Sequence, residues 1–270
     1  AGSACGKNLS TERQSTIGRQ RATNYACAPM DEAGFVSLVT DGQPAAPGYF
    51  GYDADLNRRD RELFDAAALA APLDADDFLA RRADGVVVVD ARDPLEFAAG
   101  HLVGAVNVPA DGRFAEQSGT VLDPAWPLLV IAPEGREQET VTRLARIGFD
   151  RVAGYLADPE TAFRTVPEQM RQAPRRTVAD LRTELAGAEP PLVVDVRGEG
   201  ERAEGSIPGS VHLPLAELPH RLGEIPQDRA VVVHCAGGHR SSIAASLLRH
   251  HGHPQTSDLL GGYGAWAAAA

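Results

Sequence analysis

Short runs of apolar, mostly β-branched residues recur along the chain, and each one leads into a stretch with helical spacing. The clearest runs are Val86–Asp90, Pro127–Ile131, Leu192–Asp195 and Ala230–His234. We interpret them as buried strands of parallel sheets, because a strand covered on both faces is continuously apolar rather than alternating. Polar helices are predicted before the first and third runs, over Asp74–Arg82 and Val178–Leu185. Alternating strands and helices predict an α/β layer architecture with right-handed crossovers.

The pattern is repeated once along the chain. Residues 86–109 and 191–214 align at a constant offset of 105, and they share six pairs: Asp90/Asp195, Arg92/Arg197, Glu96/Glu201, Gly100/Gly205, Gly104/Gly209 and Pro109/Pro214. We therefore predict two domains of ordinary size, a first repeat over 72–170 and a second repeat over 171–270. The Pro-rich, charged stretch Asp158–Arg175 is the predicted linker.

Residues 1–71 do not match the repeat and are not expected to form an independent domain. Helices are predicted there over Asp31–Val39 and Asp60–Ala70.

Composition narrows the possible functions. With 43% hydrophobic residues and a net charge of −11, the 270-residue chain can bury a core, and no segment has the basic character of a nucleic-acid-binding surface. No apolar run approaches the length of a membrane span. Three scattered cysteines are not a disulfide framework and fit a reducing, cytoplasmic location. The eight histidines lack zinc-ligand spacing, so no metal site is expected.

The segment Cys235-Ala-Gly-Gly-His-Arg-Ser241 carries the strongest chemical signal. It joins a predicted strand to a helix expected from Ser242, and the small residues Ala236, Gly237 and Gly238 let backbone N–H groups converge as an anion nest. The helix N-terminus and the guanidinium of Arg240 add positive charge. Cys235 is therefore expected to be a thiolate nucleophile, and its persulfide would be held by the same groups.

Roles are less clear for the other residues of this region. His239 fits substrate contact and a solvated loop residue equally well, and Ser241 completes the predicted binding loop. Asp195 and Arg197 recur in the first repeat as Asp90 and Arg92, so a structural role is favoured over a supporting catalytic one. A buried, inert Cys235 is the alternative to a reactive one, and its place in a Gly-Gly loop argues against that alternative.

At these residues the chain resembles the rhodanese family, through the motifs VVDVR, GSIPGSVHLP, VVVHCAGGHRSS and LLGGYGAW of the second repeat. The resemblance implies two tandem rhodanese-like three-layer α/β domains with parallel central sheets. It also implies a sulfurtransferase that works through a transient cysteine persulfide without a resident cofactor. Four residues separate Cys235 from Arg240, whereas the related cysteine phosphatases have five, which favours sulfur over phosphate.

The first repeat departs from this family pattern where chemistry is expected. Ala132 stands in the cysteine position, Glu137 in the place of Arg240, and Pro133 removes one N–H from the nest. The first repeat thus resembles the inactive domain of tandem rhodaneses, with a role in packing or in shaping the entrance to the active site.

The N-terminal part resembles the end of a metallo-β-lactamase-fold domain of the persulfide dioxygenase type fused to rhodanese domains. Three stretches carry this likeness: Ala1–Lys7, Gln14–Gly18 and Pro44–Asn57. The metal-binding histidines of such a domain would lie upstream of Ala1, and that domain is a candidate partner.

The expected activity is transfer of sulfane sulfur from thiosulfate or a low-molecular-weight persulfide, such as glutathione persulfide, to a thiol or to cyanide. Two alternatives remain open at this point. The chain could be a persulfide carrier for a fused or partner dioxygenase, with little turnover alone, or a phosphatase or arsenate reductase built on a related loop.

Overall fold

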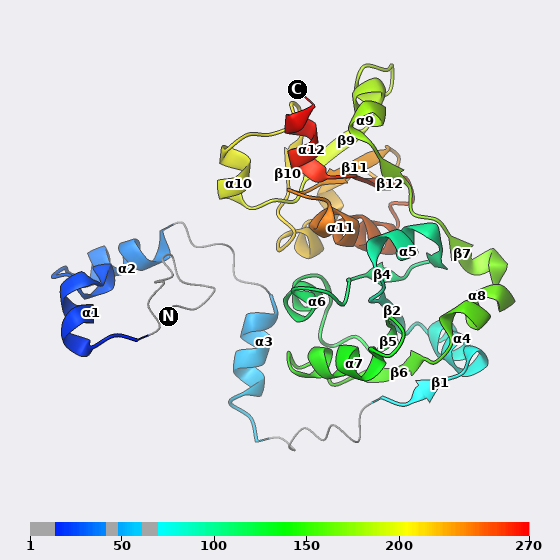
Figure 1. The fold of residues 1–270 in the computed structure, drawn as a ribbon, viewed down its shortest axis with the longest axis horizontal. Helices are drawn as coiled ribbons and strands as arrows, with labels where there is room; N and C mark the ends of the chain where they lie inside the picture. Colours follow the sequence, from blue (N-terminus) through cyan, green and yellow to red (C-terminus); the bar gives the residue numbers. More distant parts are fainter. Residues whose placement is uncertain (1–13, 42–47, 61–69, 270) are drawn as a thin grey trace. The chain divides into compact units, whose positions relative to one another are not determined.

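The computed structural model describes residues 14–41, 48–60 and 70–269 (Figure 1). The chain divides into two compact units, Ala1–Ala45 and Ala46–Ala270. The first unit contains α1 (Ile17–Thr23), a 3₁₀ turn η1 (Tyr25–Cys27) and α2 (Glu32–Thr40). The helix predicted from Asp31 is α2, with the Asp31 side chain accepting the Gly34 N–H as its N-cap. The second helix predicted in this part, Asp60–Ala70, falls almost entirely outside the described residues.

The first repeat is built on a five-stranded parallel sheet in the order β1-β6-β5-β2-β4. Its strands are β1 (Pro72–Leu73), β2 (Val87–Asp90), β4 (Val106–Asn107), β5 (Leu128–Ile131) and β6 (Val152–Leu156). Its helices are α4 (Ala75–Ala83), α5 (Pro94–Ala99), α6 (Phe114–Val121), α7 (Glu137–Ala145) and α8 (Pro159–Thr165). The predicted strands become β2 and β5, at the centre of the sheet.

The second repeat has the corresponding parallel sheet, in the order β10-β9-β11-β12-β8. Its strands are β8 (Arg175–Arg176), β9 (Leu192–Asp195), β10 (Val211–His212), β11 (Val231–His234) and β12 (Thr256–Leu259). Its helices are α9 (Val178–Leu185), α10 (Glu199–Ala203), α11 (His239–His250) and α12 (Gly262–Ala268), with 3₁₀ turns η4 (Leu218–His220) and η5 (Leu222–Glu224). The predicted α/β class with parallel central sheets is confirmed for both repeats.

The predicted linker Asp158–Arg175 is not a free connection. It contains α8, a 3₁₀ turn η3 (Pro167–Gln169) and β7 (Met170–Arg171). Strand β7 pairs antiparallel with β3 (His101–Leu102), and Arg175 already belongs to the second sheet, where its guanidinium meets the Asp258 carboxylate at 2.8 Å. The Pro and charge content suggested a linker, but these backbone and side-chain pairings give the segment a fixed place.

Helix α3 (Tyr49–Leu56) belongs to the same compact unit as the two repeats. The ring of buried Tyr49 lies so close to Gly119 on α6 that a Cβ there would come within 2.3 Å of it. Leu56 lies in the same way against Gly148, after α7. These contacts place α3 on the first repeat, so the compact unit begins ahead of the predicted domain boundary at residue 71.

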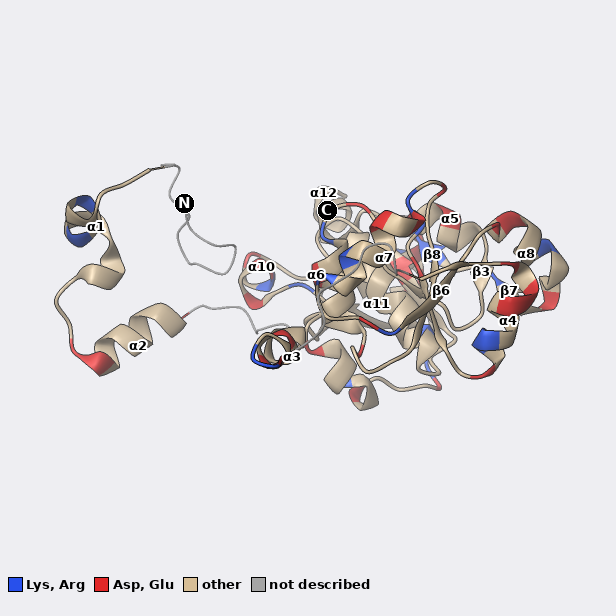
Figure 2. Ribbon diagram, turned by 90° about the horizontal axis from the view of Figure 1, so that it is seen from below, with Lys and Arg blue, Asp and Glu red and all other residues tan. Residues whose placement is uncertain are grey.

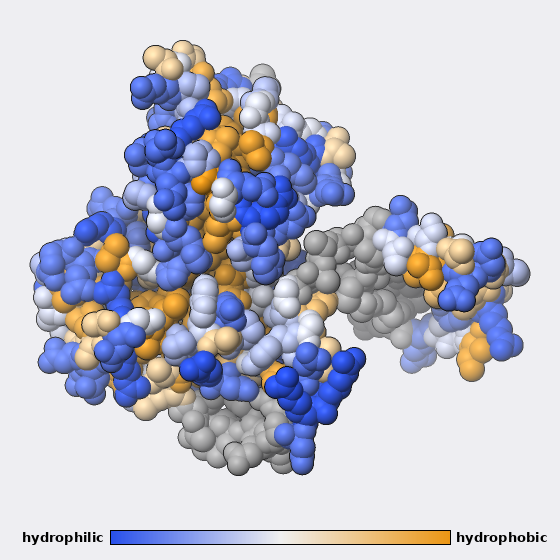
Figure 3. All heavy atoms as spheres, turned by 180° about the vertical axis from the view of Figure 1, so that it is seen from behind, coloured by the Kyte–Doolittle hydropathy of each residue, from blue (hydrophilic) through white to orange (hydrophobic). Residues whose placement is uncertain are grey.

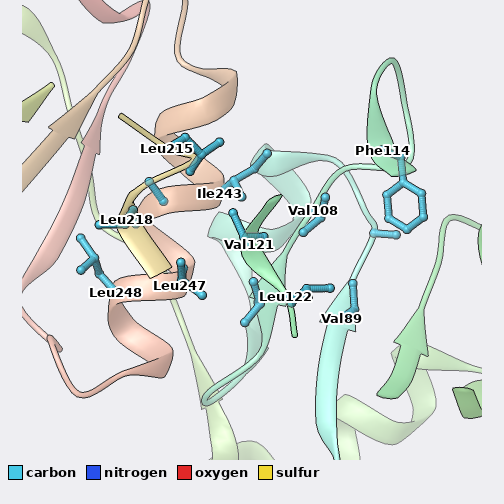
Figure 4. Close-up of a cluster of buried hydrophobic side chains, with 14 of the residues drawn as sticks. Val89, Val108, Phe114, Val121, Leu122, Leu215, Leu218, Ile243, Leu247 and Leu248 are labelled. Atoms are coloured by element: carbon cyan, nitrogen blue, oxygen red, sulfur yellow. The ribbon is translucent and has the colours of Figure 1, made fainter. Parts of the chain in front are cut away.

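One hydrophobic core joins the two repeats. It contains Val108, Val121 and Leu122 of the first repeat together with Ile243 and Leu247 of α11 in the second (Figure 4). At the edge of this core the Asn107 N–H of β4 donates to the Ser246 hydroxyl of α11 at 2.9 Å. The helix that follows the cysteine loop is therefore packed between its own sheet and the first repeat.

Charged, polar and apolar residues all occur on the surface of the described part of the chain. Acidic and basic residues are interspersed along the helices in the ribbon view of Figure 2. Hydrophilic residues cover most of the face shown in Figure 3, with apolar residues between them. None of the described helices is long and apolar enough to cross a membrane.

Candidate active site

Strand β11 brings Cys235 to the carboxyl edge of the second sheet, at its centre, between β9 and β12. Helix α11 begins at His239, three residues earlier than expected, with Gly238 at its N-cap in a left-handed conformation (φ +100°). A non-glycine residue adopts this conformation only with strain, which explains one of the two adjacent glycines. Arg240 and Ser241 consequently belong to the first turn of the helix, directly after the loop.

The Cys235 sulfur is buried and contacts two polar groups of the loop and the first turn of α11. The residue is only 1% exposed. Its Sγ accepts the Gly238 N–H at 3.1 Å and lies 3.7 Å from the buried Ser241 hydroxyl. The Gly238 N–H and the positive end of α11 present positive polarity to the sulfur, while the thiol donates to the Ser241 hydroxyl. Of the N–H groups expected to converge here, that of Gly238 donates to the sulfur, whereas Ala236 and Gly237 are exposed.

The residues at the start of α12 hold the cysteine loop through backbone hydrogen bonds. The Tyr263 N–H donates to the Cys235 carbonyl at 2.7 Å, and the Gly264 N–H donates to the Ala236 carbonyl at 3.0 Å. Gly262 has φ +57°, and a Cβ on it would lie 2.3 Å from the Cys235 carbonyl oxygen. This close approach is the physical reason for the Gly-Gly-Tyr-Gly sequence near the chain end.

The anionic partner of Arg240 in the structure is another side chain of the protein, Glu201. The two terminal nitrogens of Arg240 donate to the two carboxylate oxygens of Glu201 on α10, at 2.7 and 2.6 Å. The hydrogen bond from Arg240 is the main cause that lowers the pKa of Glu201. Sequence reasoning treated Glu201 only as one of the repeated positions. Its recurrence as Glu96 marked it, but nothing in the sequence connected it to Arg240.

Asp195 and Arg197 lie beneath the loop rather than in its mouth. Both are buried, and the Arg197 guanidinium donates to the Asp195 carboxylate at 2.9 and 2.7 Å. Arg197 also donates to the Gly205 carbonyl at 2.7 Å and stacks over the Tyr263 ring at 4.2 Å. The same pairing holds Asp90 and Arg92 together in the first repeat. These contacts favour the structural role over a catalytic one.

His234, the last residue of β11, immediately precedes Cys235 and is a further residue of the site that the sequence did not single out. It is fully buried, and its Nε2 lies 3.7 Å from the Asp195 carboxylate. Within the described residues, neither ring nitrogen has a hydrogen-bond partner. Burial, opposed by the Asp195 charge, lowers the pKa of His234 to about 4, so the ring is neutral at pH 7.

His239 contacts the first repeat. Its Nε2 lies 3.0 Å from the amide oxygen of Gln117 on α6. Burial, together with the neighbouring Arg240 charge, lowers the pKa of His239. The first repeat therefore contributes a side chain next to the loop, in agreement with the interpretation that it helps to shape the entrance.

In the corresponding loop of the first repeat, a carboxylate of the protein itself accepts a loop N–H. Ala132 is buried at the end of β5, and Gly135 adopts the left-handed conformation that Gly238 has in the second repeat. The Glu137 carboxylate accepts the Gly135 N–H at 3.1 Å. The N–H that donates to the Cys235 sulfur in the second repeat thus has its counterpart in an N–H that donates to a carboxylate in the first. Elsewhere, across the ranges that the structure covers, no cluster of three or more His, Cys, Asp or Glu residues could hold a metal ion.

Comparison with known proteins agrees with this geometry. The rhodanese-like domain family matches residues 74–157 and 177–269. A sulfurtransferase of Allochromatium vinosum is 43% identical over 83 residues, which are 31% of this chain and 78% of that protein. The thiosulfate sulfurtransferase GlpE of Stutzerimonas stutzeri is 32% identical over 106 residues, which are 39% of this chain and 86% of that protein.

The similar solved structures also include a protein of another name. A metallo-β-lactamase from Staphylococcus aureus aligns with 57% of this chain and 42% of its own length, at 28% identity and a TM-score of 0.47.

Proposed function

Since this chain belongs to the rhodanese-like family through both of its repeats, we propose that Cys235 carries sulfane sulfur as a persulfide between an anionic donor and a thiol or cyanide acceptor. The observation that carries the proposal is the position of the Cys235 sulfur. It accepts the Gly238 N–H at 3.1 Å at the start of α11, and the matching position of the first repeat has no thiol.

Transfer would take place in two displacements. In the first, the Cys235 thiolate attacks the outer sulfur of the donor, a sulfur–sulfur bond forms, and the donor's own sulfur–sulfur bond breaks. The electron pair of the broken bond leaves with sulfite when the donor is thiosulfate, and with a thiolate when the donor is a persulfide. In the second, the acceptor attacks the outer sulfur of the persulfide, and the electron pair returns to Cys235 as the thiolate.

The persulfide needs room and positive polarity just outside the buried Sγ. Gly237 is exposed, and no described atom beyond its immediate neighbours lies within 4 Å of the position that a Cβ would take on it. The Gly238 N–H and the positive end of α11 would stabilise the persulfide anion. The first displacement thus replaces one anion by another in the same polar setting.

The structure supports sulfur transfer better than phosphate hydrolysis. With four residues between Cys235 and Arg240, and with Arg240 already paired to Glu201, the loop has little capacity for the three oxygens of a phosphate group. We further propose that glutathione persulfide can serve as the donor. An upstream metallo-β-lactamase-fold domain is the proposed source of the sulfur.

The experiment compares Cys235→Ser with Cys27→Ser, which replaces the exposed cysteine of the first compact unit. We expect Cys235→Ser to lower thiocyanate formation from thiosulfate and cyanide to the rate without protein. Its intact mass should show no added sulfur, whereas Cys27→Ser should behave as the parent protein. Activity that persists in folded Cys235→Ser would refute the assignment. Rapid sulfur loading of the parent protein with negligible turnover would favour the carrier function instead.

A further inference from the structure

Arg240 is the cation that an anionic donor would be expected to bind, but its guanidinium is already paired with the Glu201 carboxylate. Both terminal nitrogens of Arg240 are engaged, and the Glu201 carboxylate also accepts the Gly198 N–H at 3.0 Å. Two parallel hydrogen bonds between a guanidinium and a carboxylate form a strong and directional pair. Arg240 is therefore not a free positive charge beside the loop.

The pair is close to the nucleophile and open to solvent. Arg240 is in the first turn of α11, and after Glu201 the Cys235 sulfur is among the groups that raise the pKa of its guanidinium. The side chains of Arg240 and Glu201 are 31% and 40% exposed. An ion from solvent can consequently reach the guanidinium, but it meets the Glu201 carboxylate at the same place.

We propose that Glu201 is a specificity-determining residue, which competes with the donor for Arg240 and disfavours sulfur donors that carry a second negative charge. This inference rests on the proposed function of Cys235. Thiosulfate brings a sulfonate-like group with an extra charge, which must either displace Glu201 or remain beside it. A donor whose only charge is on the transferable sulfur avoids both costs, because like charges brought together at an interface are repelled strongly.

The first repeat supplies a matched control. Glu96 is the counterpart of Glu201 at the offset of 105 and lies on α5. It is exposed, and no ion pair of its side chain is seen among the described residues, since Glu137 replaces the arginine. Replacing Glu96 by Gln thus removes the same charge from the equivalent helix without releasing an active-site arginine.

The experiment measures kcat/KM with two donors that differ by one charge, thiosulfate and methanethiosulfonate, for the parent protein, Glu201→Gln and Glu96→Gln. We expect Glu201→Gln to raise the thiosulfate-to-methanethiosulfonate ratio roughly tenfold, since like charges in contact are costly. Glu96→Gln should leave the ratio unchanged. If Glu201 only holds Arg240 in position, Glu201→Gln will instead lower both values together, and that result would overturn the inference.

A second measurement does not depend on turnover. Sulfate, a dianion that cannot donate sulfur, should protect Cys235 from alkylation by iodoacetamide at lower concentrations in Glu201→Gln than in the parent protein. Equal protection in both proteins would contradict the competition. If the parent protein takes up sulfur from neither donor, the proposed function itself fails. If it takes up sulfur and the donor ratio does not respond to Glu201→Gln, only the present inference fails.

Discussion

At the scale of single residues, burial decides the charge state of the histidine that precedes the nucleophile. His234 is next to the negative charge of Asp195, which favours its protonated form, yet desolvation is the larger influence and lowers its pKa to about 4. The Asp195 charge is instead compensated by Arg197 and by Arg202, whose guanidinium lies 3.0 Å away. The neutral ring therefore acts as a packing element under the loop at pH 7.

This depressed pKa predicts a loss of stability in acid. Between about pH 6.5 and 4 the unfolded chain binds a proton at His234 while the folded protein does not, so folding becomes less favourable as the pH falls through this window. From pH 7 to 5 we expect His234 to account for a decrease of about 2 kcal/mol in the free energy of unfolding. Urea titrations at the two pH values would measure the decrease.

The comparison for this prediction is between His234→Asn and His220→Asn, which replaces an exposed histidine on η4. The decrease should become smaller in His234→Asn and should persist in His220→Asn. His101, also buried and with a pKa lowered to about 4, would retain its own contribution in both variants. An unchanged pH dependence in His234→Asn would show that this ring is protonated in the folded protein.

At the scale of secondary-structure elements, the start of α12 holds the cysteine loop in place. Backbone N–H groups of Tyr263 and Gly264 donate to the carbonyls of Cys235 and Ala236, and the Gly238 N–H of the same loop donates to the Cys235 sulfur. Glycine at 262 is needed both for its positive φ and for its close approach to the Cys235 carbonyl. The loop and α12 are thus one structural unit, although the turn before α12 is separated from Cys235 by all of α11 and β12.

We expect Gly262→Ala to destabilise the protein by roughly 1–3 kcal/mol, because the new Cβ meets two carbonyl oxygens of the loop in a strained backbone conformation. It should also lower persulfide formation at Cys235, since the displaced loop no longer presents its N–H groups. Gly200→Ala on α10 is the control, because no described atom beyond its immediate neighbours lies within 4 Å of its Cβ position. Thermal unfolding and mass analysis report the two effects. Similar behaviour of both variants would contradict this account of the loop.

At the scale of the whole molecule, the two repeats share one hydrophobic core. Ile243 and Leu247 of α11 pack with Val108 and Val121 of the first repeat (Figure 4). Separating the repeats would expose these fully or almost fully buried side chains to water. The first repeat, which contains no cysteine, thus supplies packing around α11, and through Gln117 it also contacts the loop.

The shared core predicts that the repeats unfold together. The chain has two tryptophans, Trp126 in the first repeat and Trp266 in the second, so Trp126→Phe and Trp266→Phe each leave one fluorescent reporter. We expect the urea midpoints of the two variants to coincide, because a cooperative unit shows the same transition to every probe. Far-ultraviolet circular dichroism on each variant controls for destabilisation by the substitution. Two well-separated midpoints would indicate independent domains.

The sequence by itself determined the features that depend on neighbouring residues. Apolar runs such as Val231–His234 predicted the central strands, because hydrophobic patterning directly reflects burial. The repeat predicted two similar sheets. The small residues after Cys235 predicted a loop that curls around an anion, since conformational freedom and N–H direction are local backbone properties. Ala132 and Glu137 likewise marked the first repeat as lacking its nucleophile and cation.

Only the tertiary structure decided which distant side chains meet. Glu201 and Arg240 are 39 residues apart, and Gln117 and His239 are 122 apart. Such pairs depend on how strands are ordered in a sheet and how two repeats share a core, which the local pattern of apolar and polar residues does not specify. The same holds for the neutral state of His234, because desolvation depends on everything packed around the ring.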